Sequence, residues 1–196
     1  METASMIAIA LGVAWASGIK LYAAVLTLGV LGATGNVVLP EKLQVLTNPW
    51  VIGCAGFMYV MEFVADKIPG LDSAWDALHT FIRIPAGAVL AVGAVGSVDP
   101  VVATTAFLAG GAMSTGSFGT KMSTRLAINT SPEPFSNWGA SIFEDFAVAL
   151  GLYTALHHPV VFLVFLAAFI GLVIWLLPKI LRAIQRVFMR VANVFR

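Results

Sequence analysis

Apolar residues fill six long stretches of the chain, and polar or helix-breaking residues separate them. A transmembrane helix needs about 20 apolar residues to cross a hydrocarbon layer of roughly 30 Å, and the stretch 160–177 approaches that length without a charge. Proline stands at or near the breaks, for example Pro49, Pro100 and Pro159, where helices begin or end. The pattern predicts an all-α membrane protein with about six transmembrane helices, at 5–33, 49–67, 84–98, 100–128, 138–156 and 159–178.

The composition agrees with this prediction. Of the 196 residues, 59% are hydrophobic and 11% are charged, whereas about 25% are charged in an average soluble domain. The single cysteine, Cys54, excludes an intramolecular disulfide. Its apolar neighbours predict that it is a small, buried apolar residue.

Residues 179–196 are strongly basic. Lys179, Arg182, Arg186 and Arg190 recur at helical spacing with apolar residues between them, which predicts an amphipathic helix on the membrane surface. Anionic lipid headgroups would attract this tail by about 1 kcal/mol per charge. By the positive-inside rule the tail orients the protein, so with six spans both termini are expected in the cytoplasm. Binding of a partner is the alternative to this role, and no nucleic-acid partner is expected.

The two halves of the chain follow a similar order of features. Each has a long span with a polar stretch (WASGIK, STGSFGTK), then Pro-Glu, then Asn near Trp, then an acid-bearing helix (MEFVAD, FEDFAV) and a further span. Units of three spans insert in opposite orientations because three is odd. The sequence therefore predicts two inverted three-helix repeats, 1–98 and 99–178, with sites at their interface. The first repeat includes an interfacial helix at about 71–83.

A polar segment, 113–125, lies inside the predicted fourth span. A narrower stripe with Ser17 and Lys20 lies in the first span. Lys20 is near the middle of its apolar run, where a lysine costs about 2.5–3.5 kcal/mol, so it must be paired, neutral or facing water. Gly116 and Gly119 mark either a break in the fourth span or close helix packing, and the sequence leaves both open. The residues that share one face of that span are Gly110, Ser114, Ser117, Lys121, Thr124 and Arg125.

Acidic residues in two other spans supply partners for these cations. Glu62 and Asp66 share a face of the second span with Tyr59, and Glu144 and Asp145 lie near the start of the fifth. The predicted topology brings the four carboxylates to the cytoplasmic half of the membrane, where they meet the cations of the fourth span. This grouping predicts a charged cavity for protons or ions, and ion pairs that only staple the helices are the alternative. The predicted pathway residues are Ser17, Lys20, Tyr59, Glu62, Asp66, Ser114, Ser117, Lys121, Arg125, Glu144 and Asp145.

The segment 71–83 places Asp72, Asp76, His79 and Arg83 along one line of a helix. This pattern predicts an interfacial helix with a solvated face. His79 beside aspartates is a weaker candidate for a metal ligand or proton relay. Because the sequence has no dense His or Cys spacing, no metal and no cofactor are expected.

Three segments of the chain together resemble a known family. They are WASGIKLYAAVLTLGVLG, NPWVIGCAGFMYVMEFVADKIPGLDSAWDALHTFIRIPAGAVLA and STGSFGTKMSTRLAINTSPEPFSN. The chain is similar to small bacterial integral-membrane proteins catalogued as domain of unknown function 4126. The resemblance implies a multi-span protein of the bacterial inner membrane, and it brings no activity or site residue with it.

The sequence favours a transporter or channel-like protein for a small ion or polar solute over two alternatives. One alternative is a structural or assembly subunit that docks partners or anionic lipid through its small-residue third span and basic tail. The other is a lipid-modifying enzyme that uses His79, although no catalytic motif is present and an enzyme is not expected. The expected partners are the bilayer with its anionic lipid and a small solute, and a homo-oligomer is compatible with this picture.

Overall fold

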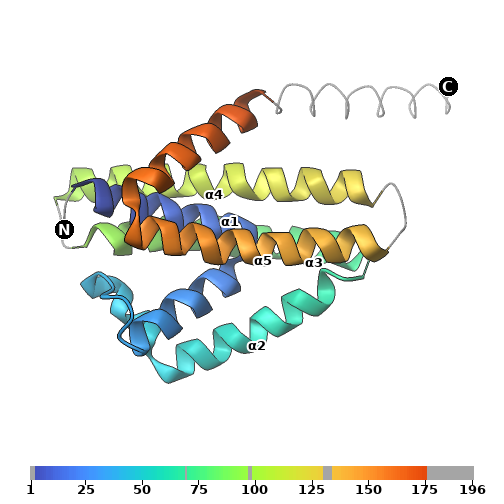
Figure 1. Cartoon of the computed structure of the whole chain (residues 1–196), viewed down its shortest axis with the longest axis horizontal. Helices are drawn as coiled ribbons and strands as arrows, with labels where there is room; N and C mark the ends of the chain where they lie inside the picture. The colour runs from blue at the N-terminus through green and yellow to red at the C-terminus, as the bar shows by residue number, and fades with distance from the viewer. Residues whose placement is uncertain (1–2, 69, 97–98, 130–133, 176–196) are drawn as a thin grey trace. The chain divides into compact units, whose positions relative to one another are not determined.

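The computed structural model describes residues 3–68, 70–96, 99–129 and 134–175 (Figure 1). These residues form helices and connecting turns, and no strand occurs among them. The predicted amphipathic helix at 179–196 lies outside the described residues. The helices are α1 (Thr3–Ala33), the short 3-10 helix η1 (Glu41–Thr47), α2 (Pro49–Ala65), α3 (Leu71–Val95), α4 (Pro100–Ile128), α5 (Pro134–His157) and a further helix, Pro159–Trp175.

Two of the helices begin where the Asx-Pro pairs of the sequence predict. The side chain of Asn48 accepts a hydrogen bond from the Trp50 backbone N–H at 2.9 Å, and Pro49 is the first residue of α2. Asp99 caps α4 in the same way, 2.7 Å from the Val101 nitrogen. These caps satisfy a free donor at the helix start, where proline costs no hydrogen bond.

Four helices are long and apolar enough to cross a membrane by length and composition: α1, α3, α4 and α5. The helices Pro49–Ala65 and Pro159–Trp175 are also apolar but shorter. At 1.5 Å per residue the 17 residues of α2 extend about 26 Å, slightly less than the hydrocarbon layer. The all-helical membrane class is therefore supported, while six full spans and inverted repeats stay predictions.

The predicted interfacial helix 71–83 and the predicted third span 84–98 form one helix, α3, with Pro85 inside it. The division between them was therefore wrong. Proline within a helix removes one backbone hydrogen bond and usually kinks or ends it. Here the helix continues through Pro85 and is packed against both α1 and α4.

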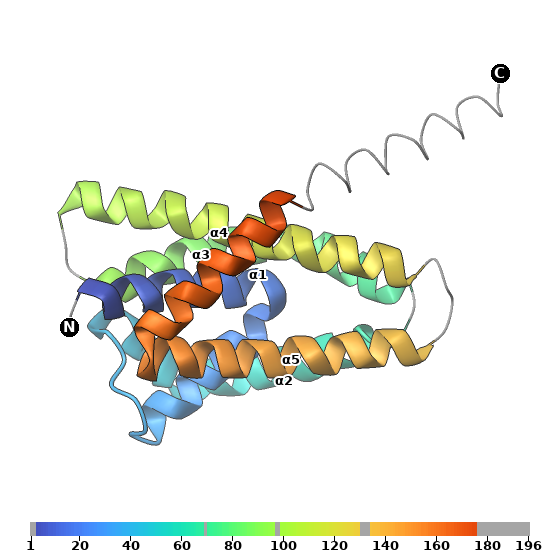
Figure 2. The same cartoon turned by 45° about the horizontal axis from the view of Figure 1, so that its top comes forward.

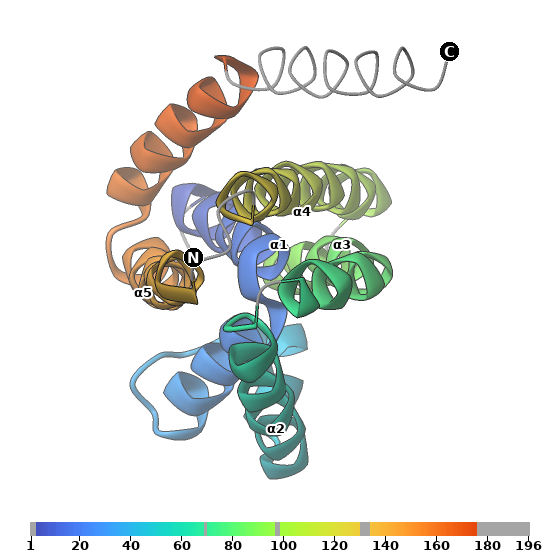
Figure 3. The same ribbon diagram turned by 90° about the vertical axis from the view of Figure 1, so that its right-hand side faces the viewer.

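Helix α1 lies at the centre of the bundle formed by α1 to α5, and it packs against each of the other four (Figure 3). It is interrupted once, at Lys20, whose backbone angles of φ −146° and ψ 90° are not helical. The two segments of α1 consequently run in different directions (Figure 2). By contrast α4 is continuous past Gly116 and Gly119, so these glycines do not mark a break.

Close contact between α1, α3 and α4 depends on glycine. A Cβ atom at Gly18 would overlap the Ser117 hydroxyl and the Ser114 carbonyl oxygen of α4. A Cβ at Gly87 would lie 2.6 Å from the Ser114 Cβ, and one at Gly110 would lie 2.5 Å from the Ala91 Cβ. The small-residue segment of α3 thus packs by close backbone approach.

The outer surface of these helices is largely apolar, as expected for contact with lipid. Trp50 and Phe81 are each 84% exposed, and several other large apolar side chains are also exposed. Cys54 is exposed as well, so the prediction that it is buried was wrong. An apolar environment in a membrane protein includes the lipid, and apolar neighbours in the sequence do not distinguish that environment from the protein core.

Candidate functional site

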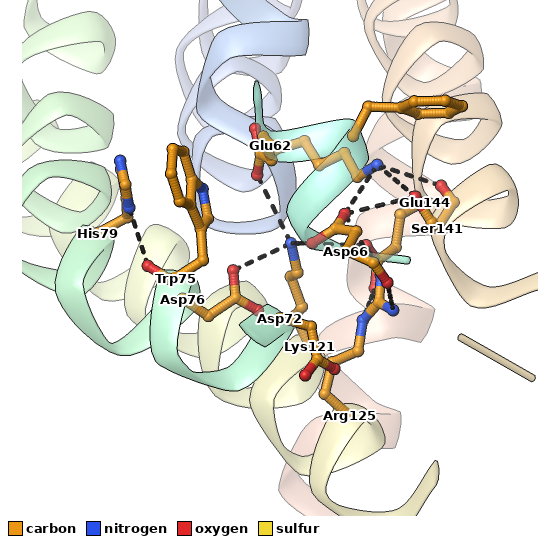
Figure 4. Close-up of polar contacts among 12 residues, drawn as sticks. Glu62, Asp66, Asp72, Trp75, Asp76, His79, Lys121, Arg125, Ser141 and Glu144 are labelled. Carbon is orange, nitrogen blue, oxygen red and sulfur yellow. Dashed lines mark hydrogen bonds and ion pairs between the residues drawn. The ribbon is translucent and has the colours of Figure 1, made fainter. Parts of the chain in front are cut away.

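Nine charged side chains from α1 to α5 and the turn after α2 are joined by ion pairs. Figure 4 shows the part of this group around Lys121. We call this group the ion-pair network. Eight of the nine residues are buried, and the side chain of Asp145 is 19% exposed. The network consists of Lys20, Glu62, Asp66, Asp76, Arg83, Lys121, Arg125, Glu144 and Asp145.

Lys121 of α4 lies at the centre of the network. Its Nζ atom is 3.2 Å from Asp76 Oδ1, 3.5 Å from Glu144 Oε2, and 3.6 Å from both Glu62 Oε1 and Asp66 Oδ1. The side chain is only 1% exposed, and Nζ makes no hydrogen bond within the described residues. Lys121 is therefore enclosed by four carboxylates from three other parts of the chain.

Lys20 stands at the interruption of α1 and reaches toward α5. Its Nζ donates to Asp145 Oδ1 at 2.7 Å, to Ser141 Oγ at 3.1 Å and to the Ser141 carbonyl at 3.2 Å. Asp66 is the residue directly after α2, and its Oδ2 atom lies 3.1 Å from Lys20 Nζ. The sequence predicts that Lys20 is paired, neutral or facing water, and in the structure it is paired.

The two arginines hold the two sides of the network. Arg83 on α3 pairs with Glu62 on α2 through Nη2 and with Asp76 through Nη1 at 2.6 Å. Arg125 on α4 donates to both oxygens of Glu144, from Nε at 3.2 Å and from Nη2 at 2.8 Å. This two-point contact is the geometry in which guanidinium and carboxylate groups bind most strongly.

The remaining donors of Arg125 bind backbone and amide groups. Nη1 donates to the Asn137 carbonyl at 3.2 Å and to the Asp66 carbonyl at 3.3 Å. Asp72, next to the network, accepts from the Asn129 side chain at 3.0 and 3.1 Å and from the Gly70 N–H at 2.8 Å. Since Asp72 lies in the first turn of α3, the helix dipole also favours its negative charge.

The face of α3 with Asp72, Asp76, His79 and Arg83 is buried, so the predicted solvated face was wrong. The reason is that Asp76 and Arg83 contact charged groups of α2 and α4 instead of water. Their spacing was visible in the sequence, but a charged helical face has the same pattern whether it meets water or other charges. Asp76 and Arg83 are therefore site residues that the predicted set lacks.

Asn137 and Ser141 are also absent from the predicted set. Together with Glu144 they form a stripe at i, i+4 and i+7 on α5, and Asn137 and Ser141 are among its most buried polar residues. The same helical periodicity that identified the polar face of α4 would have found them. Of that predicted face, Gly110, Ser114, Ser117, Lys121 and Arg125 are buried, whereas Thr124 is exposed.

The three serine hydroxyls of the predicted pathway bind backbone oxygens. Ser17 and Ser114 both donate to the Arg83 carbonyl, at 2.9 and 3.1 Å, and Ser117 donates to the Met113 carbonyl at 3.1 Å. The bonds of Ser17 and Ser114 to Arg83 connect α1, α3 and α4. The other hydroxyls of this part of α4 donate to the carbonyl four residues earlier, which satisfies them without water; they belong to Thr115, Thr120, Ser123 and Thr124.

A pocket of about 430 Å³ reaches the network at one residue, Asp145. Tyr59 of α2 and Thr27 of α1 contribute its other polar side chains. Its apolar lining is formed by Ala23, Leu26, Ile142, Phe146 and Ala149.

His79 is held away from the network. Its Nδ1 lies 2.8 Å from the Trp75 carbonyl, so this nitrogen carries the proton and donates it. The ring stacks on Trp75 at 4.3 Å and meets the edge of Tyr22 at 5.7 Å. Within the described residues, no group of three or more His, Cys, Asp or Glu side chains is arranged to hold a metal ion.

Replacing Arg125 with lysine keeps the charge but removes the two-point contact with Glu144. We expect Arg125→Lys to lower the free energy of unfolding by about 1–3 kcal/mol, because buried acceptors lose their donors. Denaturant unfolding in detergent, followed by circular dichroism, measures this change. Lys42→Arg, at an exposed position of η1, is the control for exchanging the two cations. Equal stability of Arg125→Lys and the unsubstituted protein would contradict the expectation.

Helices apolar enough to cross a membrane, joined by a buried charged network, define this chain as a helical membrane protein. The chain belongs to the family described as Domain of unknown function (DUF4126), whose model matches residues 7–179. The family predicted from the sequence is therefore confirmed. No curated protein and no solved structure matches the chain.

Proposed function

We propose that this protein moves a small ion across the membrane and that the ion-pair network is its site. The observation that supports the proposal best is the burial of eight charged side chains between apolar helices. Removing each ion from water costs several kcal/mol, which ion pairing offsets only in part. Ionisable residues inside a membrane commonly mark ion pathways.

Two features of α1 support this proposal. The helix is interrupted at Lys20, and discontinuous helices form the ion and substrate sites of many transporters. Its second segment also lines the pocket that reaches Asp145, the partner of Lys20. In the proposed topology, six spans form two inverted repeats in the inner membrane, both termini are cytoplasmic, and the network lies in the cytoplasmic half.

A flux assay in proteoliposomes tests the proposal. The protein is reconstituted and ion movement is followed with a pH-sensitive dye and with potassium and chloride indicators inside the vesicles. We expect flux above that of empty vesicles and about tenfold lower flux for Lys20→Met, since about 1.4 kcal/mol of barrier is tenfold in rate.

Two further variants complete the flux assay. Asp145→Asn removes the partner at the pocket and should lower flux as well, whereas Lys42→Met, exposed and outside the network, should match the unsubstituted protein. Equal amounts of folded protein, checked by size-exclusion chromatography, make the rates comparable. Absence of flux for every ion tested, from correctly inserted protein, would contradict the proposal.

A structural role in assembly is the second candidate, because every charge of the network has a partner of opposite sign. Such ion pairs can staple helices and need no ligand. In that case Lys20→Met would change complex formation or expression without any flux to lose. Native gel electrophoresis of membranes that contain each variant separates the two functions.

A further inference from the structure

The ion-pair network contains more negative than positive groups. Five carboxylates face four cations within the described residues. Two charged neighbours make no ion pair with the network in this part of the chain: Asp72, and Lys67, whose Nζ donates to the Phe63 carbonyl at 3.2 Å. Including both leaves the same excess of one negative charge. A buried, unbalanced charge is costly in a low-dielectric environment.

Several buried atoms of the network have no hydrogen-bond partner in the described structure: Glu62 Oε2, Asp66 Oδ1, Asp76 Oδ2, Arg83 Nε and Lys121 Nζ. Of these oxygens, Asp66 Oδ1 lies 3.6 Å from Lys121 Nζ. Glu62 Oε2 and Asp76 Oδ2 have no hydrogen-bond partner in the described structure, and both side chains are fully buried. Their other oxygens already contact Arg83 and Lys121. A proton on either free oxygen would therefore leave the other oxygen free to accept from these cations. Lys121 Nζ, also without a hydrogen bond, is the cation between them.

We infer that the network binds one exchangeable proton on the Glu62–Asp76 pair beside Lys121. The proton comes from solvent and forms an O–H bond on one carboxylate oxygen, which makes the network neutral. This inference rests on the proposed function and makes it more specific, because it names the proton as the ion that the protein moves. The free oxygens are an observation independent of the charge count.

A proton fits this place better than a metal cation does. Sodium or calcium needs a shell of several oxygen atoms, and the oxygens that face inward here already surround the ammonium of Lys121. No described acidic group is arranged to hold a metal ion. A proton requires only one oxygen and no coordination shell.

The network also gives the proton a route to the pocket. Asp145 lines the pocket and lies 2.7 Å from Lys20, which is 3.1 Å from Asp66, and Asp66 is 3.6 Å from Lys121. A chain of ionisable groups thus joins the pocket to the protonated pair. The charged and titratable groups around that pair are Lys20, Tyr22, Tyr59, Asp66, Lys67, Asp72, His79, Arg83, Lys121, Arg125, Glu144 and Asp145.

Infrared spectroscopy of the full chain in lipid bilayers tests this inference near neutral pH. A protonated carboxyl group has a carbonyl stretching band that ionised carboxylates lack and that shifts in deuterated water. We expect one carboxyl equivalent in the unsubstituted protein. Isotopic labelling of glutamate shifts the band if Glu62 carries the proton, and labelling of aspartate shifts it if Asp76 does.

Two variants change the charge count in opposite directions. Asp145→Asn balances the network and should remove the band, whereas Lys20→Met removes a cation and should double it. Glu41→Gln, an exposed carboxylate of η1, is the matched control and should leave one equivalent. If Lys20→Met does not fold, Asp145→Asn alone decides, because its side chain is partly exposed and its loss removes no cation.

The outcomes separate the inference from the proposed function. No band in the unsubstituted protein, or a band that Asp145→Asn leaves unchanged, overturns the inference even if flux is present. A band that follows the charge count in a protein without flux supports proton binding and rejects the transport role. A band that follows the charge count, together with proton flux that falls in Asp145→Asn, supports both.

Discussion

Lys121→Met is expected to lower the free energy of unfolding by about 3–5 kcal/mol, the usual cost of removing one partner from a buried ion pair. Methionine retains an apolar stem of similar length, so the change isolates the ammonium group. Without it, four carboxylates stay close together with three cations beside them, Lys20, Arg83 and Arg125. Thermal unfolding in detergent, followed by circular dichroism, measures the loss.

The pH dependence of this loss has a definite sign. The carboxylates that Lys121→Met leaves without a counter-charge can be neutralised by protons, so the stability difference from the unsubstituted protein should shrink as the pH falls. Adding Glu62→Gln to Lys121→Met should recover part of the stability by removing one of these charges. Lys42→Met in η1 controls for the loss of a lysine at an exposed position. A Lys121→Met protein that unfolds at the same temperature would show that the ammonium contributes no net stability.

Much of the network could be predicted from helical periodicity. Lys121 and Arg125 share a face of α4, and Glu62 and Asp66 lie four residues apart, so each helix presents its charges to one side. Because unpaired charges are costly in lipid, these faces had to meet one another or water. The structure brings them together.

The partners of a charged face could not be predicted in the same way. Asp76 and Arg83 have the periodicity of a solvated interfacial helix, yet Asp76 pairs with Lys121 and Arg83 pairs with Glu62. Local pattern gives the direction of a side chain, but burial depends on helices distant in the sequence. The interruption at Lys20 is of the same kind, since the residues flanking it, WASGI and LYAAV, contain no proline, and a glycine such as Gly18 also occurs inside the continuous helix α4.

The hydroxyl-rich part of α4 shows what helical periodicity alone could not predict. Ser114 and Ser117 were placed on the correct face, but that face is filled by Gly18 and by the backbone of α3. A row of small polar residues is compatible with a water-lined cavity and with close helix packing, and the volume of the opposing residue decides between them. Gly18 is the opposing residue here, which makes it the position at which the packing can be tested.

Gly18→Ala is expected to destabilise the protein by about 2–3 kcal/mol, in the upper range for overpacked positions. The added Cβ would overlap the Ser114 carbonyl oxygen and the Ser117 hydroxyl. Ser117 can rotate away, but a backbone carbonyl can move only with its helix. Helices α1 and α4 must therefore separate, and the hydrogen bonds of Ser17 and Ser114 to the Arg83 carbonyl must lengthen. Unfolding in detergent measures the change in stability.

Gly116→Ala is the matched control, because it makes the same substitution on the opposing helix, where no atom lies within 4 Å of the new Cβ. Alanine favours a helix over glycine by about 0.8–1.0 kcal/mol, so this variant should be as stable as the unsubstituted protein or slightly more so. Both variants gain the same helix propensity, and the difference between them therefore reports the contact of α1 with α4 alone. Similar stabilities for Gly18→Ala and Gly116→Ala would mean that the two helices are not in close contact at Gly18.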